Sequence, residues 1–466
     1  MSASRAALRL RRSQPSALAL VLLAGLALWL AWGCPSPCAT VVGQDSTTYL
    51  YMAELGTPYQ LLTNVRTPGY PLFLRGLLPL CPDRSCVPFV HRLLVALAVA
   101  GLWLGLTRWG LSGWTALVAA GPVLFSPLVQ QWSPLVMTDV PAAALAVGAV
   151  ALLLAAVARP GHWTWLALGA LVAATWLVRP AYLFLVPLVP LAGVGLAWLR
   201  GGSGSGEGKP ARWRALGVLA LVTLGPFLAY SALRWIVAGH FAAASFGGFN
   251  AIGIAASLIN DRTVATLPAE DRPLAEEIQR RRKRAGLAPI RRGSRMALWW
   301  QQYTPNVWDV AVPAVQAQVV ADHGIEKPGA PQNSWVHVEM NRRLSRLSLR
   351  LLAQRKGLYG RWLAYGWRHA LASTWARPEV RWPAVALAVG VVLTLLRRRQ
   401  AALRPALALP ALATAYYLAA MTLVLLVEPA VSRYLWAAEI LLPGFLLAGV
   451  VEVGKAVVAH RALPAA

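Results

Sequence analysis

Residues 140–158 read VPAAALAVGAVALLLAAVA, a run of apolar side chains without a single charge. An α-helix needs about 20 such residues to cross the hydrocarbon core of a bilayer. Similar runs recur along the chain, and by hydrophobic length we predict ten spans, at residues 16–33, 88–107, 112–131, 140–158, 163–178, 181–199, 215–237, 380–396, 405–427 and 434–453. The sequence therefore predicts an all-α fold, a polytopic membrane protein with about ten transmembrane helices.

The composition excludes an ordinary soluble protein, because 57% of the residues are hydrophobic and only 13% are charged. The formal net charge of +26 would suit a protein that binds nucleic acid. Many of the arginines, however, flank the predicted spans, which is typical of cytoplasmic membrane edges. The sequence has no zinc-finger spacing, basic zipper or RNA-binding aromatic signature, so we expect no nucleic-acid partner.

The first apolar run, at residues 16–33, follows several arginines but has no clean signal-peptide cleavage site. We therefore predict a retained first helix and a cytoplasmic N-terminus. Ten spans then place residues 34–87, 126–139, 238–379 and 428–433 outside, and the connections at Arg108, Arg159, Arg200–Arg214 and Arg397–Arg404 inside, in agreement with the positive-inside rule. Arginine outnumbers lysine, and alanine, leucine, glycine and proline are abundant, which favours a bacterial source. We expect a multi-pass protein of the bacterial cytoplasmic membrane.

This topology divides the chain into three parts. Residues 1–237 form an N-terminal transmembrane module that includes the first outer loop, residues 34–87. Residues 238–379 form a long helical extracytoplasmic loop, and residues 380–466 form a C-terminal transmembrane module.

Three helices are predicted in the long loop. Start and stop signals predict one at Pro268–Arg284, and apolar residues at helical spacing predict another at Ser334–Gln354. Tyr359–Trp375 mixes tryptophans with arginines, which predicts an amphipathic helix that lies in the membrane interface.

The first outer loop carries the densest group of candidate functional residues. It contains Gln44-DSTTYLYM-Ala53 and then Arg66-TPGYPLF-Leu74. Asp45 is a carboxylate at the outer membrane edge, where a base could reach both a lipid headgroup and an acceptor hydroxyl. The alternative is a structural role, because Asp before Ser-Thr-Thr is a plausible helix N-cap.

The Asp-x3-Tyr-x3-Ala spacing and the Arg-x-Pro-Gly-Tyr-Pro segment resemble the first extracytoplasmic loop of the GT-C superfamily of integral-membrane glycosyltransferases, of the protein O-mannosyltransferase and aminoarabinose transferase type. The resemblance covers residues 40–145 and, more weakly, residues 428–445. It implies a polyprenyl-phosphate-linked sugar as donor, and inverting transfer on the periplasmic side to a glycan, lipid or protein acceptor. It also implies that Asp45 is the general base, in an enzyme surrounded by membrane lipids.

Arg66 and Tyr70 are candidate substrate-binding residues of the same loop. A guanidinium group is shaped for bidentate contact with phosphate, and Tyr70 could line an acceptor or isoprenoid groove. The alternative is a simple turn toward the membrane, for which Pro68 and Gly69 are sufficient.

His91 and Arg92 lie near the outer end of the second predicted span. Ionisable residues at membrane depth usually face a bundle interior and often mark function. His91 could bind the phosphate or hold a carboxylate. For Arg92, interfacial snorkelling is an equal alternative.

Asp139 is the second candidate catalytic residue, because superfamily members often place an acid in the second outer loop. Thr138-Asp139 before Pro141 is also a good helix start. Asp45 and Asp139 could share a divalent cation, but this chain has Ser46 where many relatives carry a second acid. We predict neither a metal nor another cofactor.

Arg433 and Tyr434 precede the last span and are candidate substrate-binding residues. Together they look like the C-terminal feature of the superfamily, in which the arginine would stabilise the phosphate leaving group. The alternative is an ordinary interface anchor. Arg179, at another outer edge, has the same two interpretations.

The four cysteines form two close pairs, Cys34 with Cys38 and Cys81 with Cys86, at the two ends of the first outer loop. An oxidising compartment makes disulfides plausible, with three possible connectivities. A four-thiolate zinc site and free thiols remain alternatives.

Two other functions compete with glycosyl transfer. A lipid-headgroup transporter or flippase would carry ionisable residues near the bilayer midplane and repeated halves. Here the candidate charges gather at the outer edge, which favours chemistry there. A non-catalytic membrane scaffold of the same fold is the third hypothesis.

Overall fold

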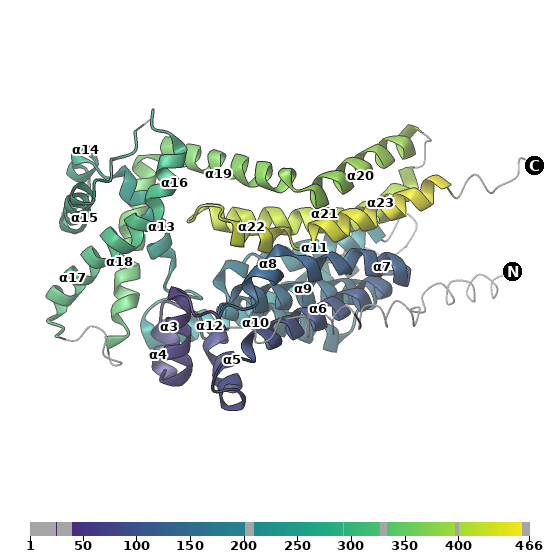
Figure 1. The fold of residues 1–466 in the computed structure, drawn as a ribbon, viewed down its shortest axis with the longest axis horizontal. Helices are drawn as coiled ribbons and strands as arrows, with labels where there is room; N and C mark the ends of the chain where they lie inside the picture. Colours follow the sequence, from purple (N-terminus) through teal and green to yellow (C-terminus); the bar gives the residue numbers. More distant parts are fainter. Residues whose placement is uncertain are drawn as a thin grey trace, which may run out of the picture.

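The computed structural model describes residues 40–200, 209–291, 293–326, 333–396 and 400–458, together with Gly25. Regular structure in these residues is helical, apart from an isolated bridge between Val41 and Leu135. Figure 1 shows a long bundle of helices with a second group of helices gathered at one end of it.

The bundle is built from α6 (Val87–Trp109), α7 (Gly113–Ala120), α8 (Pro127–Trp132), α9 (Asp139–Ala158), α10 (His162–Val178), α11 (Leu185–Arg200), α12 (Lys209–Ala238), α20 (Pro378–Leu396), α21 (Gln400–Leu425), α22 (Ser432–Glu439) and α23 (Leu442–Val458). Short helical turns extend α7 and α11. The chain is therefore all-helical and polytopic, as predicted.

Eight stretches in the described part of the chain are long and apolar enough to span a membrane. They are Val87–Trp109, Gly113–Trp132, Asp139–Ala158, Pro180–Leu199, Trp213–Ala238, Pro378–Leu396, Ala406–Leu425 and Ser432–Val458. The predicted span at 163–178 corresponds to α10, which is apolar but has only 17 residues. The predicted span at 16–33 lies outside the described residues, apart from Gly25.

Small residues bring the spans close together. Helix α9 is the most deeply buried of the eight candidate spans, and most of its residues are buried. A Cβ atom on Gly105 of α6 would lie only 2.5 Å from the carbonyl oxygen of Ala151 in α9. Glycine at this position therefore lets the two backbones touch, as is common where helices pack within a membrane.

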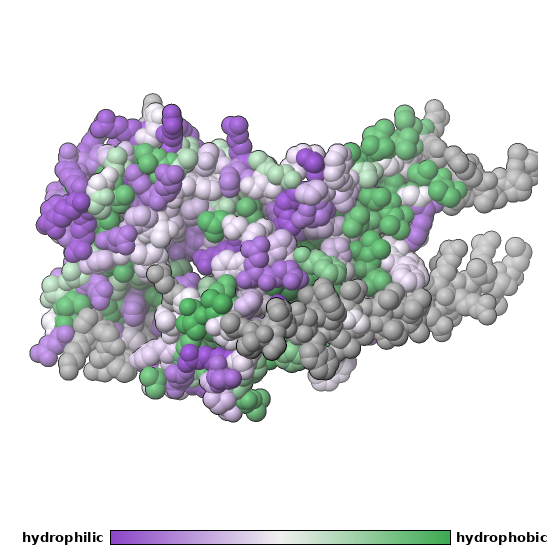
Figure 2. Space-filling view, in the orientation of Figure 1, coloured by the Kyte–Doolittle hydropathy of each residue, from purple (hydrophilic) through white to green (hydrophobic). Residues whose placement is uncertain are grey.

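The second group of helices forms an outer layer over one end of the bundle. It contains α3 (Gln44–Glu54), α4 (Pro58–Thr63), α5 (Gly69–Leu77), α13 (Gly247–Ala255), α14 (Asp261–Ala265), α15 (Arg272–Arg284), α16 (Met296–Pro305), the π-helix η5 (Asn306–Ala311), α17 (Val312–His323) and α18 (Val336–Gln354). Helices α13 to α18 enclose a hydrophobic core of their own. Figure 2 shows hydrophilic residues gathered over this layer and hydrophobic ones over α20 and the neighbouring part of α23. Helices α15 and α18 lie within the predicted helices at Pro268–Arg284 and Ser334–Gln354 and end at the same residues.

Helix α19 (Lys356–Ala376) contains the predicted helix at Tyr359–Trp375 and packs along α21. Trp362 donates a hydrogen bond from Nε1 to the carbonyl oxygen of Leu425 (3.0 Å), and Thr374 donates one to the hydroxyl of Tyr417 (3.0 Å). The earlier residue of α19, Trp362, pairs with the later residue Leu425, and the later residue Thr374 pairs with the earlier residue Tyr417. The two helices therefore run antiparallel and side by side. Helix α19 is not among the stretches that are long and apolar enough to span a membrane, and its place in the membrane interface stays a prediction. In Figure 1, α19 and α20 form one long arm that bends where α20 begins.

The loops between spans gather at two opposite ends of the bundle. At one end Arg404 stacks over Trp198 (5.6 Å to the ring centroid), and Lys455 donates to the hydroxyl of Thr115 (2.9 Å). The loops that were predicted to lie outside meet at the other end, under the outer layer. This grouping agrees with the predicted topology, while the direction of the bundle in the membrane stays a prediction.

Candidate functional site

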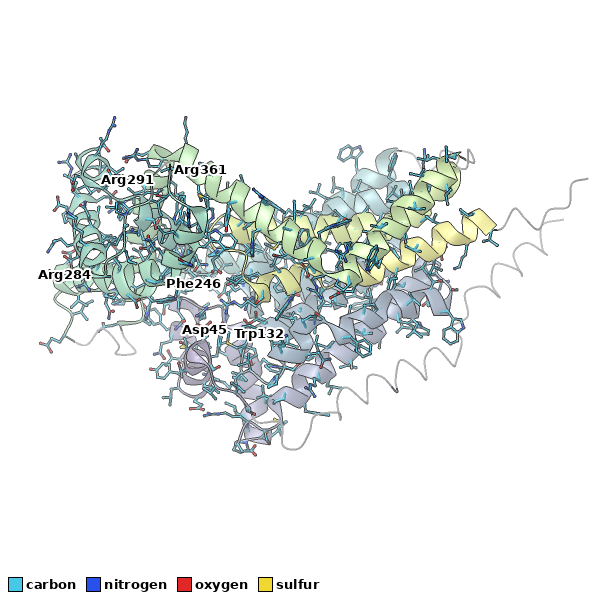
Figure 3. The ribbon with its side chains drawn as sticks, turned by 45° about the horizontal axis from the view of Figure 1, so that its top comes forward. Asp45, Trp132, Phe246, Arg284, Arg291 and Arg361 are labelled. Atoms are coloured by element: carbon cyan, nitrogen blue, oxygen red, sulfur yellow. The ribbon has the colours of Figure 1, made fainter. Side chains whose placement is uncertain are left out.

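A cavity of about 900 Å³ lies where the outer layer meets the bundle. Its wall comes from segments that are far apart in the sequence, namely residues 43–49, 65–67, 132–138, 179–183, 241–250, 303–308 and 423–434, with Phe227. Figure 3 shows Asp45 and Trp132 near this boundary, with Phe246 above them in the outer layer. The exposed Arg284, Arg291 and Arg361 lie away from the cavity.

Asp45 lies in the first turn of α3, between two arginines. Its Oδ1 accepts a hydrogen bond from Nη2 of Arg66 (2.6 Å), and its Oδ2 lies 3.8 Å from Nη1 of Arg433. The N-cap of α3 is Gly43, whose N–H donates to the hydroxyl of Ser46 (2.9 Å). Asp45 is therefore not the cap, although a negative charge in the first turn suits the helix dipole. Its side chain is 31% exposed.

Arg66 is held by aromatic rings as well as by charge. Its guanidinium carbon lies 4.7 Å from the ring centroid of Phe246 and 5.5 Å from that of Tyr49. Such cation–π contacts fix the plane of the guanidinium. Its Nε is buried and has no hydrogen-bond partner among the described residues. Arg66 therefore still has a donor to offer.

Arg433 and Tyr434 open α22 and lie on the cavity wall, as does Arg66. Nη2 of Arg433 donates to the hydroxyl of Tyr434 (3.0 Å), and its guanidinium also faces the ring of Trp132 (6.0 Å). The sequence resemblance pointed to this pair, and the structure places it opposite the first outer loop.

Asp139 lies one layer behind the wall. It is buried, and its Oδ2 accepts a hydrogen bond from Nη1 of Arg179 (2.9 Å), which also donates to the hydroxyl of Thr138 (2.8 Å). Arg179 itself lines the cavity and faces the ring of Tyr434 (5.3 Å). The geometry suits Asp139 to holding Arg179 in place. The role of Arg179 was visible in the sequence only as a cation between two spans.

Tyr70 and His91 are buried next to each other, away from the cavity wall. His91 Nδ1 lies 3.1 Å from the carbonyl oxygen of Ser133, which can only accept, so Nδ1 carries the proton. Nε2 is then the acceptor for the Tyr70 hydroxyl (3.2 Å). Burial raises the pKa of Tyr70 far above its ordinary value and keeps the hydroxyl protonated. Tyr70 and His91 join α5 to α6, and the ring of Tyr70 packs against that of Tyr49. The half-buried Arg92 does not line the cavity either.

Two wall residues had no assigned role at the level of the sequence, Tyr303 at the end of α16 and Glu428 just after α21. The Tyr303 hydroxyl is buried and has no hydrogen-bond partner in the described part of the chain. Burial, followed by the negative charge of Glu428, raises the pKa of Tyr303 well above its ordinary value. In the sequence, the indication of a role for Glu428 was its position in the same outer segment as Arg433. No such indication existed in the sequence for Tyr303.

The described residues contain no group of three or more His, Cys, Asp or Glu side chains placed to hold a metal ion. Cys81 and Cys86 are not bonded to each other, and the N–H of Cys86 donates to Sγ of Cys81 (2.9 Å). Cys34 and Cys38 lie outside the described residues, so the predicted disulfides stay a prediction.

Comparisons with protein-family models, with curated proteins and with solved structures found no match to this chain.

Proposed function

We propose that this protein is a membrane glycosyltransferase of the GT-C type. It transfers a sugar from a polyprenyl-phosphate donor to an acceptor hydroxyl at the extracytoplasmic face of the bacterial cytoplasmic membrane. The observation that carries this proposal is the position of Asp45 between Arg66 and Arg433 on the wall of a largely apolar cavity, at the end of a transmembrane bundle.

Three guanidinium groups on one wall suit the phosphate of the donor. Arg66, Arg179 and Arg433 all line the cavity. Asp45 and Asp139 balance part of this charge, and the unpartnered Nε of Arg66 is free to bind an anion. When the bond from the sugar to the phosphate breaks, negative charge grows on the phosphate oxygen. Fixed cations at that point stabilise the transition state more than the ground state.

Asp45 is the base that the reaction requires. The acceptor hydroxyl attacks the anomeric carbon while Asp45 takes its proton, and the electrons of the broken C–O bond stay on the polyprenyl phosphate. Asp45 is the partly exposed carboxylate on the wall of the first outer loop, whereas Asp139 is enclosed and ion-paired. A single displacement of this kind inverts the anomeric carbon.

Apolar residues of the cavity wall suit an isoprenoid chain. Phe241, Trp308 and Leu426 contribute to the wall and are also 40% or more exposed on the surface. Exposed aromatic and aliphatic side chains at the end of a transmembrane bundle favour contact with lipid tails.

The test is the lipid and glycan profile of a strain that lacks the gene. Mass spectrometry is expected to find an accumulated polyprenyl-phosphate sugar together with an acceptor that lacks this sugar. The wild-type gene should restore the acceptor, and a gene with Asp45→Asn should not. A donor trapped on the cytoplasmic face would instead indicate transport and would contradict the proposal.

A further inference from the structure

Among the polar groups of the cavity wall that neither the phosphate nor the proton transfer uses, two carry a further inference. The first is the Tyr303 hydroxyl, which is buried without a hydrogen-bond partner among the described residues. Buried polar groups in folded proteins are nearly always paired, so an unpaired one on a cavity wall points to a ligand or to water that completes it.

The second group is the carboxylate of Glu428, which with Asp45 makes up the carboxylates of the described cavity wall. Burial, followed by the negative charge of Glu428, raises the pKa of the Tyr303 hydroxyl. Both groups lie on the wall of the same cavity, where burial keeps the tyrosine protonated. Together they present a hydroxyl that both donates and accepts, and a carboxylate that only accepts.

This pair selects its ligand by chemistry. A phosphate group is repelled by the Glu428 carboxylate and is better held by the guanidinium groups of Arg66, Arg179 and Arg433 on the same cavity wall. An isoprenoid chain offers no hydrogen bond. Sugar hydroxyls donate to a carboxylate and also pair with a phenol, so they satisfy both groups at once.

We propose that Tyr303 and Glu428 form the subsite that binds the hydroxyl groups of a sugar ring. This inference rests on the proposed glycosyl transfer and names the part of the cavity that recognises the sugar. The ring belongs either to the donor or to a glycan acceptor, which share this chemistry.

The test compares two lipids on detergent-purified full-length protein: radiolabelled polyprenyl phosphate, and the same lipid carrying a sugar. The variants are Tyr303→Phe and Glu428→Gln. The matched controls are Tyr59→Phe and Glu452→Gln, which change residues outside the cavity wall. Both test variants should bind the bare lipid as the wild type does and lose about tenfold or more in affinity for the sugar-bearing lipid, as expected when a hydrogen bond to substrate is removed.

A second binding experiment uses donor lipids that lack one sugar hydroxyl. Removing the hydroxyl that Tyr303 contacts should weaken binding to the wild type and have no effect on Tyr303→Phe. If donor binding is intact in both variants and the KM for a glycan acceptor rises instead, the subsite is confirmed for the acceptor sugar.

Equal loss of affinity for both lipids would overturn the subsite, because it would indicate damage to the phosphate site or the fold. Unchanged donor and acceptor kinetics in an active enzyme would overturn it as well. A wild-type protein that neither prefers the sugar-bearing lipid nor transfers the sugar would instead contradict the proposed function, so the two failures are distinguishable.

Discussion

Asp45 is held by two arginines that come from opposite ends of the chain, Arg66 and Arg433. Asp45→Asn keeps the shape of the side chain but cannot take a proton. We expect turnover to fall roughly 100- to 10,000-fold, while the melting temperature and the binding of polyprenyl phosphate change little. The measurement is sugar transfer by purified variants beside a thermal melt.

Glu54→Gln is the matched control, because it makes the same kind of change on the same helix, at an exposed residue away from the cavity wall. It should be fully active. An active Asp45→Asn enzyme would reject Asp45 as the base.

Asp139 and Arg179 lead to a different expectation. Both side chains are at most 11% exposed, so removing the charge of one leaves the other unpaired. Asp139→Asn should destabilise the protein by about 3 kcal/mol and weaken the binding of bare polyprenyl phosphate, because Arg179 loses the partner that orients it. Lipid binding and thermal melts of Asp139→Asn and Asp45→Asn, measured together, check this. Unimpaired lipid binding by Asp139→Asn would remove Arg179 from the phosphate site.

The residues on the cavity wall were only partly predictable. Asp45, Arg66, Arg433 and Tyr434 belong to recognisable local motifs, and all four line the cavity. In the sequence, Asp139 and His91 were candidates for the same site, but in the structure they lie behind the cavity wall. Their positions depend on partners about 40 residues away, such as Arg179 and Ser133, and no local pattern encodes such a pairing.

At the scale of the helix, hydrophobic length and capping signals located most elements, because both are local properties of the chain. Helix α19 shows where this information ends. Tryptophans among arginines suit a helix at the membrane interface and equally one that packs along a bundle. The sequence does not reveal the contact of Trp362 with Leu425, because these two residues are 63 positions apart.

The packing of α13 on α18 gives a prediction for the outer layer. A Cβ atom on Gly248 would lie 2.3 Å from the carbonyl oxygen of Asn341, a backbone atom that cannot easily move. Gly248→Ala should therefore lower stability by about 1–3 kcal/mol and reduce activity, since α13 supplies part of the cavity wall. In contrast, a Cβ atom on Gly360 of α19 meets open space, so Gly360→Ala should leave stability equal or slightly higher. Thermal melts decide the comparison, and a silent Gly248→Ala would contradict the close packing.

For the whole molecule, the gathering of loops at two opposite ends of the bundle predicts which residues are accessible from outside the cell. We expect single cysteines at Tyr59 and Ala321 to react with a membrane-impermeant thiol reagent from outside the cell, and one at Gly454 to react only after permeabilisation. The native cysteines are first replaced by serine. The reason is that short arginine-bearing loops stay on the cytoplasmic side. Labelling at Gly454 alone in intact, periplasm-accessible cells would invert the topology.

The cavity wall joins the first outer loop to the segment before the last helix, and this has a consequence for biosynthesis. Ribosomes make the chain from the N-terminus, so Asp45 is in place long before Arg433 is translated. Until α22 and α23 enter the bilayer, the carboxylate lacks one of its two arginines and the cavity lacks one side. Under the proposed function, catalytic competence would therefore arrive with the final stretch of synthesis, and a chain that stops early would leave an inert membrane protein.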